Sequence, residues 1–149
     1  MSNWQLYLHR AILTEYPDAH PVDDFELINT GAGIEIKTWN EAKLGPFVEV
    51  EWMQKCNDLK QAQTIAIVKS EAERRILLIC PVWKQRNLTA RAAELAIKGV
   101  ANWTADEQSE VNAGQLLWDQ IKAIREASDA LEAMDPIPQD FDDDSYWPS

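Results

Sequence analysis

The fold of this chain is decided by the stretch IAIVKSEAERRILLICPVW, residues 65–83. Its apolar side chains recur at intervals of three or four residues, at Ile65, Val68, Ala72, Ile76, Ile79 and Trp83. This spacing places them on one face of an α-helix. Pro81 lies inside the pattern, and a proline costs about 3 kcal/mol in a helix interior. We therefore expect a kink between Leu77 and Cys80, or a break followed by a short restart.

A second long helix is predicted after Thr104. Thr104 and Glu107 have the S/T-x-x-E spacing of a capping box, which marks the start of a helix. The predicted buried face of this helix carries Leu117, Ile121, Ile124, Ser128 and Leu131. We expect the helix to run to about Ala133 and to end ahead of Pro136.

The segment between these two helices predicts a compact helix over residues 89–98. Thr89 would be its N-cap and Gly99 its C-terminal stop. Two long apolar stripes joined by a short helix are typical of an antiparallel helical hairpin. We expect this hairpin to cover residues 46–134, with its first helix beginning near residue 48.

The N-terminal part predicts a small α-β-β unit over residues 1–45. Residues 3–16 place their apolar side chains on one helix face. Residues 25–28 and 34–39 alternate apolar and polar side chains around a glycine-bearing turn, as in a β-hairpin. A two-stranded hairpin is marginally stable alone, so we expect it to pack on the helix. The expected fold class is α+β and mostly helical.

The composition argues against two classes of partner. The net charge is −11, whereas nucleic-acid binding needs clustered Lys and Arg to contact phosphates. The longest uncharged apolar stretch, residues 76–83, is far shorter than the ~20 residues that span a bilayer. We therefore expect no nucleic-acid partner and no membrane association. The seven tryptophans are either core anchors or contacts for another chain.

The sequence contains no pattern that predicts catalysis or metal binding. It lacks a Ser-His-Asp set, a nucleophile elbow and a phosphate-binding loop. The aspartates within residues 140–144 lack the alternating ligands and the central glycine of a calcium loop. Two histidines and two cysteines on separate segments do not predict a zinc site. We expect no enzymatic activity, no cofactor and no metal.

The C-terminal stretch DPIPQDFDDDSYWPS, residues 135–149, has five aspartates and no basic residue. We expect it to be extended, because its prolines leave no helical periodicity. Two interpretations remain open: a solvated acidic tail, or a strap that docks through Tyr146 and Trp147. The strap could dock on a partner or on the one basic zone of the chain, which consists of Arg74, Arg75, Lys84, Arg86 and Arg91.

Two stretches resemble proteins of tailed phages. EYPDAHPVDDFELINTGAGIEIKTWN (residues 15–40) is similar to the N-terminal module of small XkdW-type proteins, which are found beside tail-fibre genes. The second stretch begins with EAERRILLICPVWKQRN (residues 71–87) and ends with IKAIREASDALEAM (residues 121–134). It resembles the helical C-terminal part of tail-fibre proteins and of tail-fibre assembly chaperones, as does the aromatic end of the tail.

The resemblance implies an accessory protein that binds a phage tail fibre and assists its folding, assembly or attachment. It would act in the cytoplasm of the bacterial host during assembly, and it could stay in the virion tail. Two alternatives are a permanent connector of the fibre or baseplate and a prophage-encoded acidic regulator of a host protein. A homo-oligomer formed through the hairpin is a further option. The expected partner contacts are Trp83, Trp103, Trp118, Tyr146, Trp147, Arg74 and Arg86.

Overall fold

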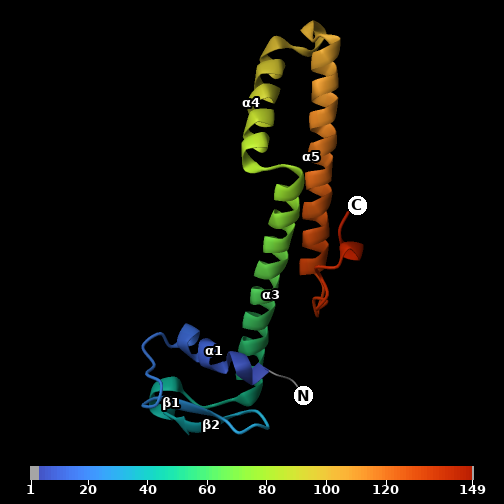
Figure 1. Cartoon of the computed structure of the whole chain (residues 1–149). Helices are drawn as coiled ribbons and strands as arrows, with labels where there is room; N and C mark the ends of the chain where they lie inside the picture. The colour runs from blue at the N-terminus through green and yellow to red at the C-terminus, as the bar shows by residue number, and fades with distance from the viewer. Residues whose placement is uncertain (1–3, 149) are drawn as a thin grey trace. The chain divides into compact units, whose positions relative to one another are not determined.

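The computed structural model describes residues 4–148 and confirms the predicted class, mostly helical α+β (Figure 1). The chain divides into two compact units, Met1–Thr64 and Ile65–Ser149. The division falls inside the long helix α3 (Glu49–Ile79), which begins close to the predicted start near residue 48. The predicted boundary between residues 45 and 46 lies ahead of this helix.

The N-terminal unit combines helix α1 (Leu8–Glu15) with the predicted β-hairpin. A turn of 3-10 helix, η1 (Trp4–Tyr7), precedes α1, and a short helix, α2 (Glu41–Leu44), follows the strands. Strands β1 (Phe25–Asn29) and β2 (Ile34–Trp39) pair antiparallel. The apolar face of α1 packs on this hairpin, as expected. The core contains Trp4, Leu8, Ala11, Ile12, Ala19, Phe25, Leu44, Trp52 and Cys56.

Two of these core residues explain why the unit continues past residue 45. Trp52 and Cys56 lie on the first turns of α3 and are almost completely buried. The ring of Trp52 meets the ring of Trp39 edge-on, with centroids 5.4 Å apart. Trp39 in turn donates its indole N–H to the carbonyl of Gly45 at 2.8 Å. The start of α3 is therefore needed to close the core of the small module.

A buried carboxylate, that of Asp24, ties the loop before β1 to the segment after β2. It accepts hydrogen bonds from the backbone N–H of His20 at 2.7 Å and from Asn40 Nδ2 at 3.0 Å, and it pairs with Lys43. These bonds, that from His20 foremost and then that from Lys43, lower the pKa of Asp24 to about 2. The ionised form is therefore the one that stabilises the unit.

The C-terminal unit is shaped by Pro81, where the structure has a break rather than a kink. Helix α3 ends at Ile79, and α4 (Val82–Lys98) starts directly after the proline (Figure 1). The prediction of a compact helix starting at Thr89 is wrong, because Pro81 already serves as the N-cap. Thr89 lies inside α4 and donates its hydroxyl to the carbonyl of Gln85. The middle helix of the hairpin is therefore 17 residues long.

Both predicted stop and start signals at the tip of the hairpin are confirmed. Gly99 ends α4 with φ of +80°, in the left-handed region that favours glycine. A 3-10 turn, η2 (Val100–Asn102), leads into α5 (Ala105–Glu132). Thr104 and Glu107 form the capping box, with both reciprocal hydrogen bonds present. Within its unit, α5 runs antiparallel beside α4 and beside the later turns of α3 (Figure 1).

The tail is not extended within residues 135–148, so this part of the prediction is corrected. It forms turns and a short 3-10 helix, η3 (Asp144–Tyr146), and it packs on α3 and α5. The reason is that an apolar seat and a cation, Arg75, lie within its reach. One buried cluster of the unit consists of Val68, Ala72, Ile124, Leu131 and Trp147.

We expect Asp24→Asn to lower the free energy of unfolding at pH 7 and to flatten its pH dependence. Because the pKa of Asp24 is lowered from its usual 3.8 to about 2, its contribution is fully present above about pH 4 and is lost as the pH falls toward 2. Urea unfolding at a series of pH values measures both effects. Asp23→Asn, at an exposed neighbour, is the matched control. Equal pH profiles for wild type and Asp24→Asn would contradict this role.

Candidate functional site

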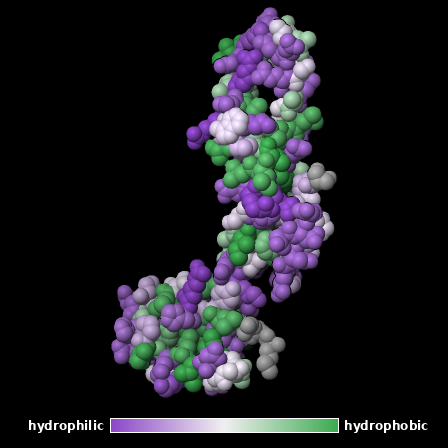
Figure 2. Space-filling view, viewed as in Figure 1, coloured by the Kyte–Doolittle hydropathy of each residue, from purple (hydrophilic) through white to green (hydrophobic). Residues whose placement is uncertain are grey.

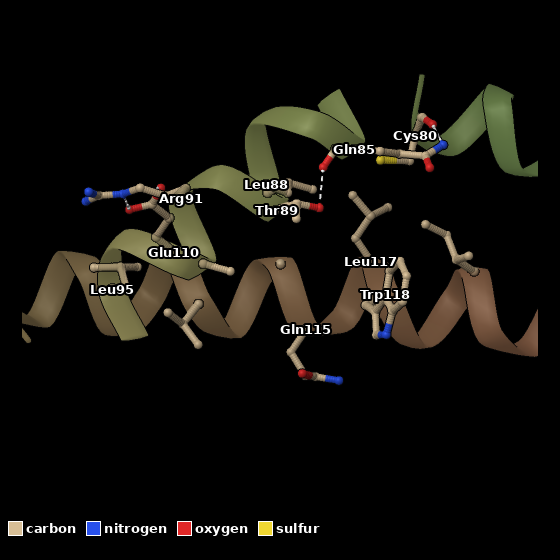
Figure 3. A pocket seen from close by; sticks show the side chains of 14 residues that line it. Cys80, Gln85, Leu88, Thr89, Arg91, Leu95, Glu110, Gln115, Leu117 and Trp118 are labelled. Carbon is tan, nitrogen blue, oxygen red and sulfur yellow. Dashed lines mark hydrogen bonds and ion pairs between the residues drawn. The ribbon is translucent and has the colours of Figure 1, made fainter. Parts of the chain in front are cut away.

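An apolar groove lies between α4 and α5. Its volume is about 340 Å³, and side chains from both helices line it (Figure 3). Leu88, Ala92 and Leu95 line it from α4, and Gly114, Leu117 and Ile121 line it from α5. Leu95 and Ile121 are buried at its base. The groove therefore offers mainly aliphatic carbon to whatever enters it.

Small residues keep the groove open where the two helices pass each other. Gly114 has no side chain, and a Cβ placed there would lie 3.9 Å from Leu88 Cδ2. Arg91 reaches across the gap to Glu110, with its Nε 3.1 Å from both carboxylate oxygens. Lys98 similarly binds Glu107 at 2.6 Å. The helices are thus held at the rim by ion pairs, while the space between them is only partly filled.

Besides Arg91 and Glu110, the groove is lined by few polar side chains, and two of these are already hydrogen-bonded. Gln85 donates its side-chain N–H to the carbonyl of Cys80 at 2.7 Å, and Gln115 donates to Asp119 at 2.9 Å. The Arg125 guanidinium lies 5.5 Å from the ring centroid of Trp118. In residues 4–148, no cluster of His, Cys, Asp or Glu could hold a metal ion. The groove is therefore built for apolar recognition.

Further apolar side chains of the same unit are exposed. Leu78, Val82 and Trp83 surround the break between α3 and α4 and are 70%, 50% and 65% exposed. Figure 2 shows apolar side chains gathered over this part of the hairpin. On α5, Leu116 is also exposed, and Trp118, which lines the groove, is 46% exposed. We call the groove together with these five residues the apolar face.

Of the predicted contact residues, Trp118 lines the groove, whereas Trp83 is exposed at the start of α4 and is not part of the groove lining. Trp103 is half-buried, and its indole N–H donates to the carbonyl of Leu95 at 2.8 Å, so its role is to close the end of α4. Arg74 is bound by Glu71 at 2.6 Å. Arg86 is exposed on α4.

The two aromatic residues of the tail are placed on the chain itself. Trp147 is only 5% exposed, and Tyr146 is half-buried beside it. Arg75, which was only one member of the predicted basic zone, is the residue that contacts the tail. The sequence singled out Leu117, Trp118 and Ile121 on α5, but it missed the groove-lining residues of α4. The steps of four and three from Leu88 to Ala92 and Leu95 could have shown them if α4 had been extended back to Val82.

No family model, curated protein or solved structure gave a significant match to this chain. None of the helices in the described residues is long and apolar enough to span a bilayer.

We expect Gly114→Leu to fill the groove and to reduce binding of the apolar dye ANS, measured by its fluorescence. Ala113→Leu, on an exposed position of the same helix, is the control and should leave dye binding unchanged. Gly114→Ala should raise the free energy of unfolding by roughly 0.5–1 kcal/mol, because the new methyl fits at ordinary contact distance and alanine favours the helix. Dye binding that is identical in wild type and Gly114→Leu would show that the groove is not open in solution.

Proposed function

We propose that this protein is a phage tail-fibre accessory protein that binds the fibre and assists its folding, assembly or attachment. The observation that carries the proposal is the apolar face. The hairpin carries a groove of about 340 Å³ that Trp118 helps to line, and Trp83 is a further exposed tryptophan at the start of α4. Tryptophan is among the residues that most often dominate protein–protein binding energy. A surface of this kind is suited to being covered by another chain.

The physical demand of fibre assembly matches such a surface. Chains that must oligomerise expose apolar surface until their partners bury it, and in that interval they aggregate. A binding protein with an apolar face can cover that surface during the interval. The net charge of −11 would help to keep the complex in solution. The resemblance of residues 15–40 and 71–134 to phage tail proteins supports the same proposal.

The charges beside the apolar face add a preference for one kind of fibre surface. Lys84 and Arg86 lie on α4 close to Trp83, and neither has an ion pair within residues 4–148. Arg91 and Lys98 on the same helix are already paired with carboxylates of the hairpin. Two uncommitted cations next to an exposed tryptophan favour an apolar fibre segment flanked by carboxylates.

We expect co-expression with the tail-fibre protein encoded nearby to show the activity directly. The fibre should be insoluble or monomeric alone and should form soluble trimers in the presence of this protein. The double variant Trp83→Ala, Trp118→Ala should bind the fibre on the order of tenfold to a hundredfold more weakly, because truncating central tryptophans typically costs 2 kcal/mol or more. Affinity is measured by biolayer interferometry.

Val50→Ala, at a side chain that is 67% exposed in the other unit, is the matched control and should bind like wild type. Trimers that form equally well without this protein, with no complex detected, would contradict the chaperone role. Mass spectrometry of purified virions then distinguishes the two remaining roles. If the protein is present in virions in stoichiometric amounts, it is a permanent connector. If it is absent from virions and does not bind the fibre, a regulator of a host protein is favoured.

A further inference from the structure

The tail occupies an apolar seat on α3 and α5. The ring of Trp147 is buried in a cluster that contains Val68 and Ala72 of α3 and Ile124 and Leu131 of α5. Ile137, Phe141 and Tyr146 pack around this cluster and are partly buried. If the tail left, the apolar side chains of both helices would be uncovered together. We call this surface the tail seat.

Arg75 binds the polar part of the tail. Its Nη1 lies 2.8 Å from Asp144 Oδ1, and its Nη2 donates to the backbone carbonyl of Asp142 at 2.8 Å. Its Nε donates to Glu71 Oε1 at 2.7 Å, which fixes the orientation of the guanidinium. The same group lies 4.9 Å from the ring centroid of Trp147. One arginine side chain, only 14% exposed, thus recognises a carboxylate, a carbonyl and an aromatic ring.

The tail presents these groups through a compact local structure. Asp143 Oδ1 accepts the backbone N–H of Ser145 at 2.8 Å and starts the turn η3. The Trp147 indole N–H donates to the carbonyl of Phe141 at 2.8 Å, which closes the loop. The recognised unit is therefore short, residues 141–147, and consists of an acidic turn followed by an aromatic ring. A segment of this size could be supplied by a different chain.

We propose that the tail seat is a binding site for an acidic, aromatic-ended segment of another protein, and that the tail is an internal ligand that competes for it. The charge balance supports this occupant. Without the tail, Nη1 and Nη2 of Arg75 lose the acceptors on Asp144 and Asp142, while Nε keeps its bond to Glu71. The open seat is then an apolar pocket with a cation at its edge, which selects an aromatic residue next to a carboxylate.

Competition follows from the tether. The tail is joined to α5 through a few residues, so its effective concentration at the seat is in the millimolar range. A partner segment of the same chemistry must displace the tail. The partner segment binds only when its own affinity for the seat, together with any contacts it makes elsewhere, outweighs this advantage of the tethered tail. The seat stands apart from the α4–α5 groove, and the proposal holds whether or not the partner is a tail fibre.

The test uses the full-length chain and a labelled peptide, IPQDFDDDSYWP, which copies residues 137–148. Trp147→Ala should free the seat by removing the buried ring of the internal ligand. Fluorescence anisotropy should show that the peptide binds Trp147→Ala at least tenfold more tightly than wild type, whose seat is occupied. The peptide that lacks its own tryptophan should not bind. Binding should weaken as salt is raised, because one charge pair is involved.

The double variant Trp147→Ala, Arg75→Ala should lose at least tenfold in peptide affinity. The control is the double variant Trp147→Ala, Arg86→Ala, which has the same net charge as Trp147→Ala, Arg75→Ala. It should bind the peptide as tightly as Trp147→Ala alone, because Arg86 lies on α4. Circular dichroism checks that each variant keeps its helices. A folded Trp147→Ala chain that does not bind the peptide, or binds it equally well without Arg75, would overturn the proposal. Sedimentation could instead show that the wild type is a dimer and that the Trp147→Ala variant is a monomer. The segment in the seat would then come from a second copy of this chain, and the assignment to another protein would be overturned.

Discussion

The guanidinium of Arg75 is the contact on which the folded position of the tail in the C-terminal unit depends. It lies on α3, is oriented by Glu71, and holds both the acidic turn and the aromatic ring of the tail. Trp147 then completes the core between α3 and α5. Five aspartates would otherwise keep this segment in solvent, since their repulsion disfavours a compact tail. A single cation with several acceptors offsets that tendency.

The two halves of α5 differ in what covers them. Its C-terminal half, with Ile124 and Leu131, is closed by α3 and by the tail. Its N-terminal half faces α4 across a groove that no segment of the described chain fills. The break at Pro81 creates this difference, because α4 does not continue the helical path of α3. We interpret the open half as the surface for a partner and the closed half as a seat with its own occupant.

The sequence predicted the parts of the fold that depend on local signals. The stripe of α3, the capping box at Thr104 and the stop at Gly99 are local patterns, and all are present. The start of α4 was missed because Pro81 was read as an interruption rather than as a cap. Docking of the tail on the basic zone that includes Arg75 was one of the interpretations open from the sequence, but the contacts could not be assigned, because the bonds join residues 67 and 69 positions apart. The groove depends on how two helices are spaced, which no single helix reveals.

The most direct test of the account is the hydrogen exchange of the Trp147 indole N–H, followed by NMR in the intact chain. If the tail folds back onto the hairpin, this proton should exchange slowly and have a shifted resonance, because it is buried and donates to the carbonyl of Phe141. Nuclear Overhauser contacts to methyl groups of Ile124 and Leu131 should accompany it. Exchange as fast as in a free peptide, with no such contacts, would show that the tail does not fold back onto the hairpin.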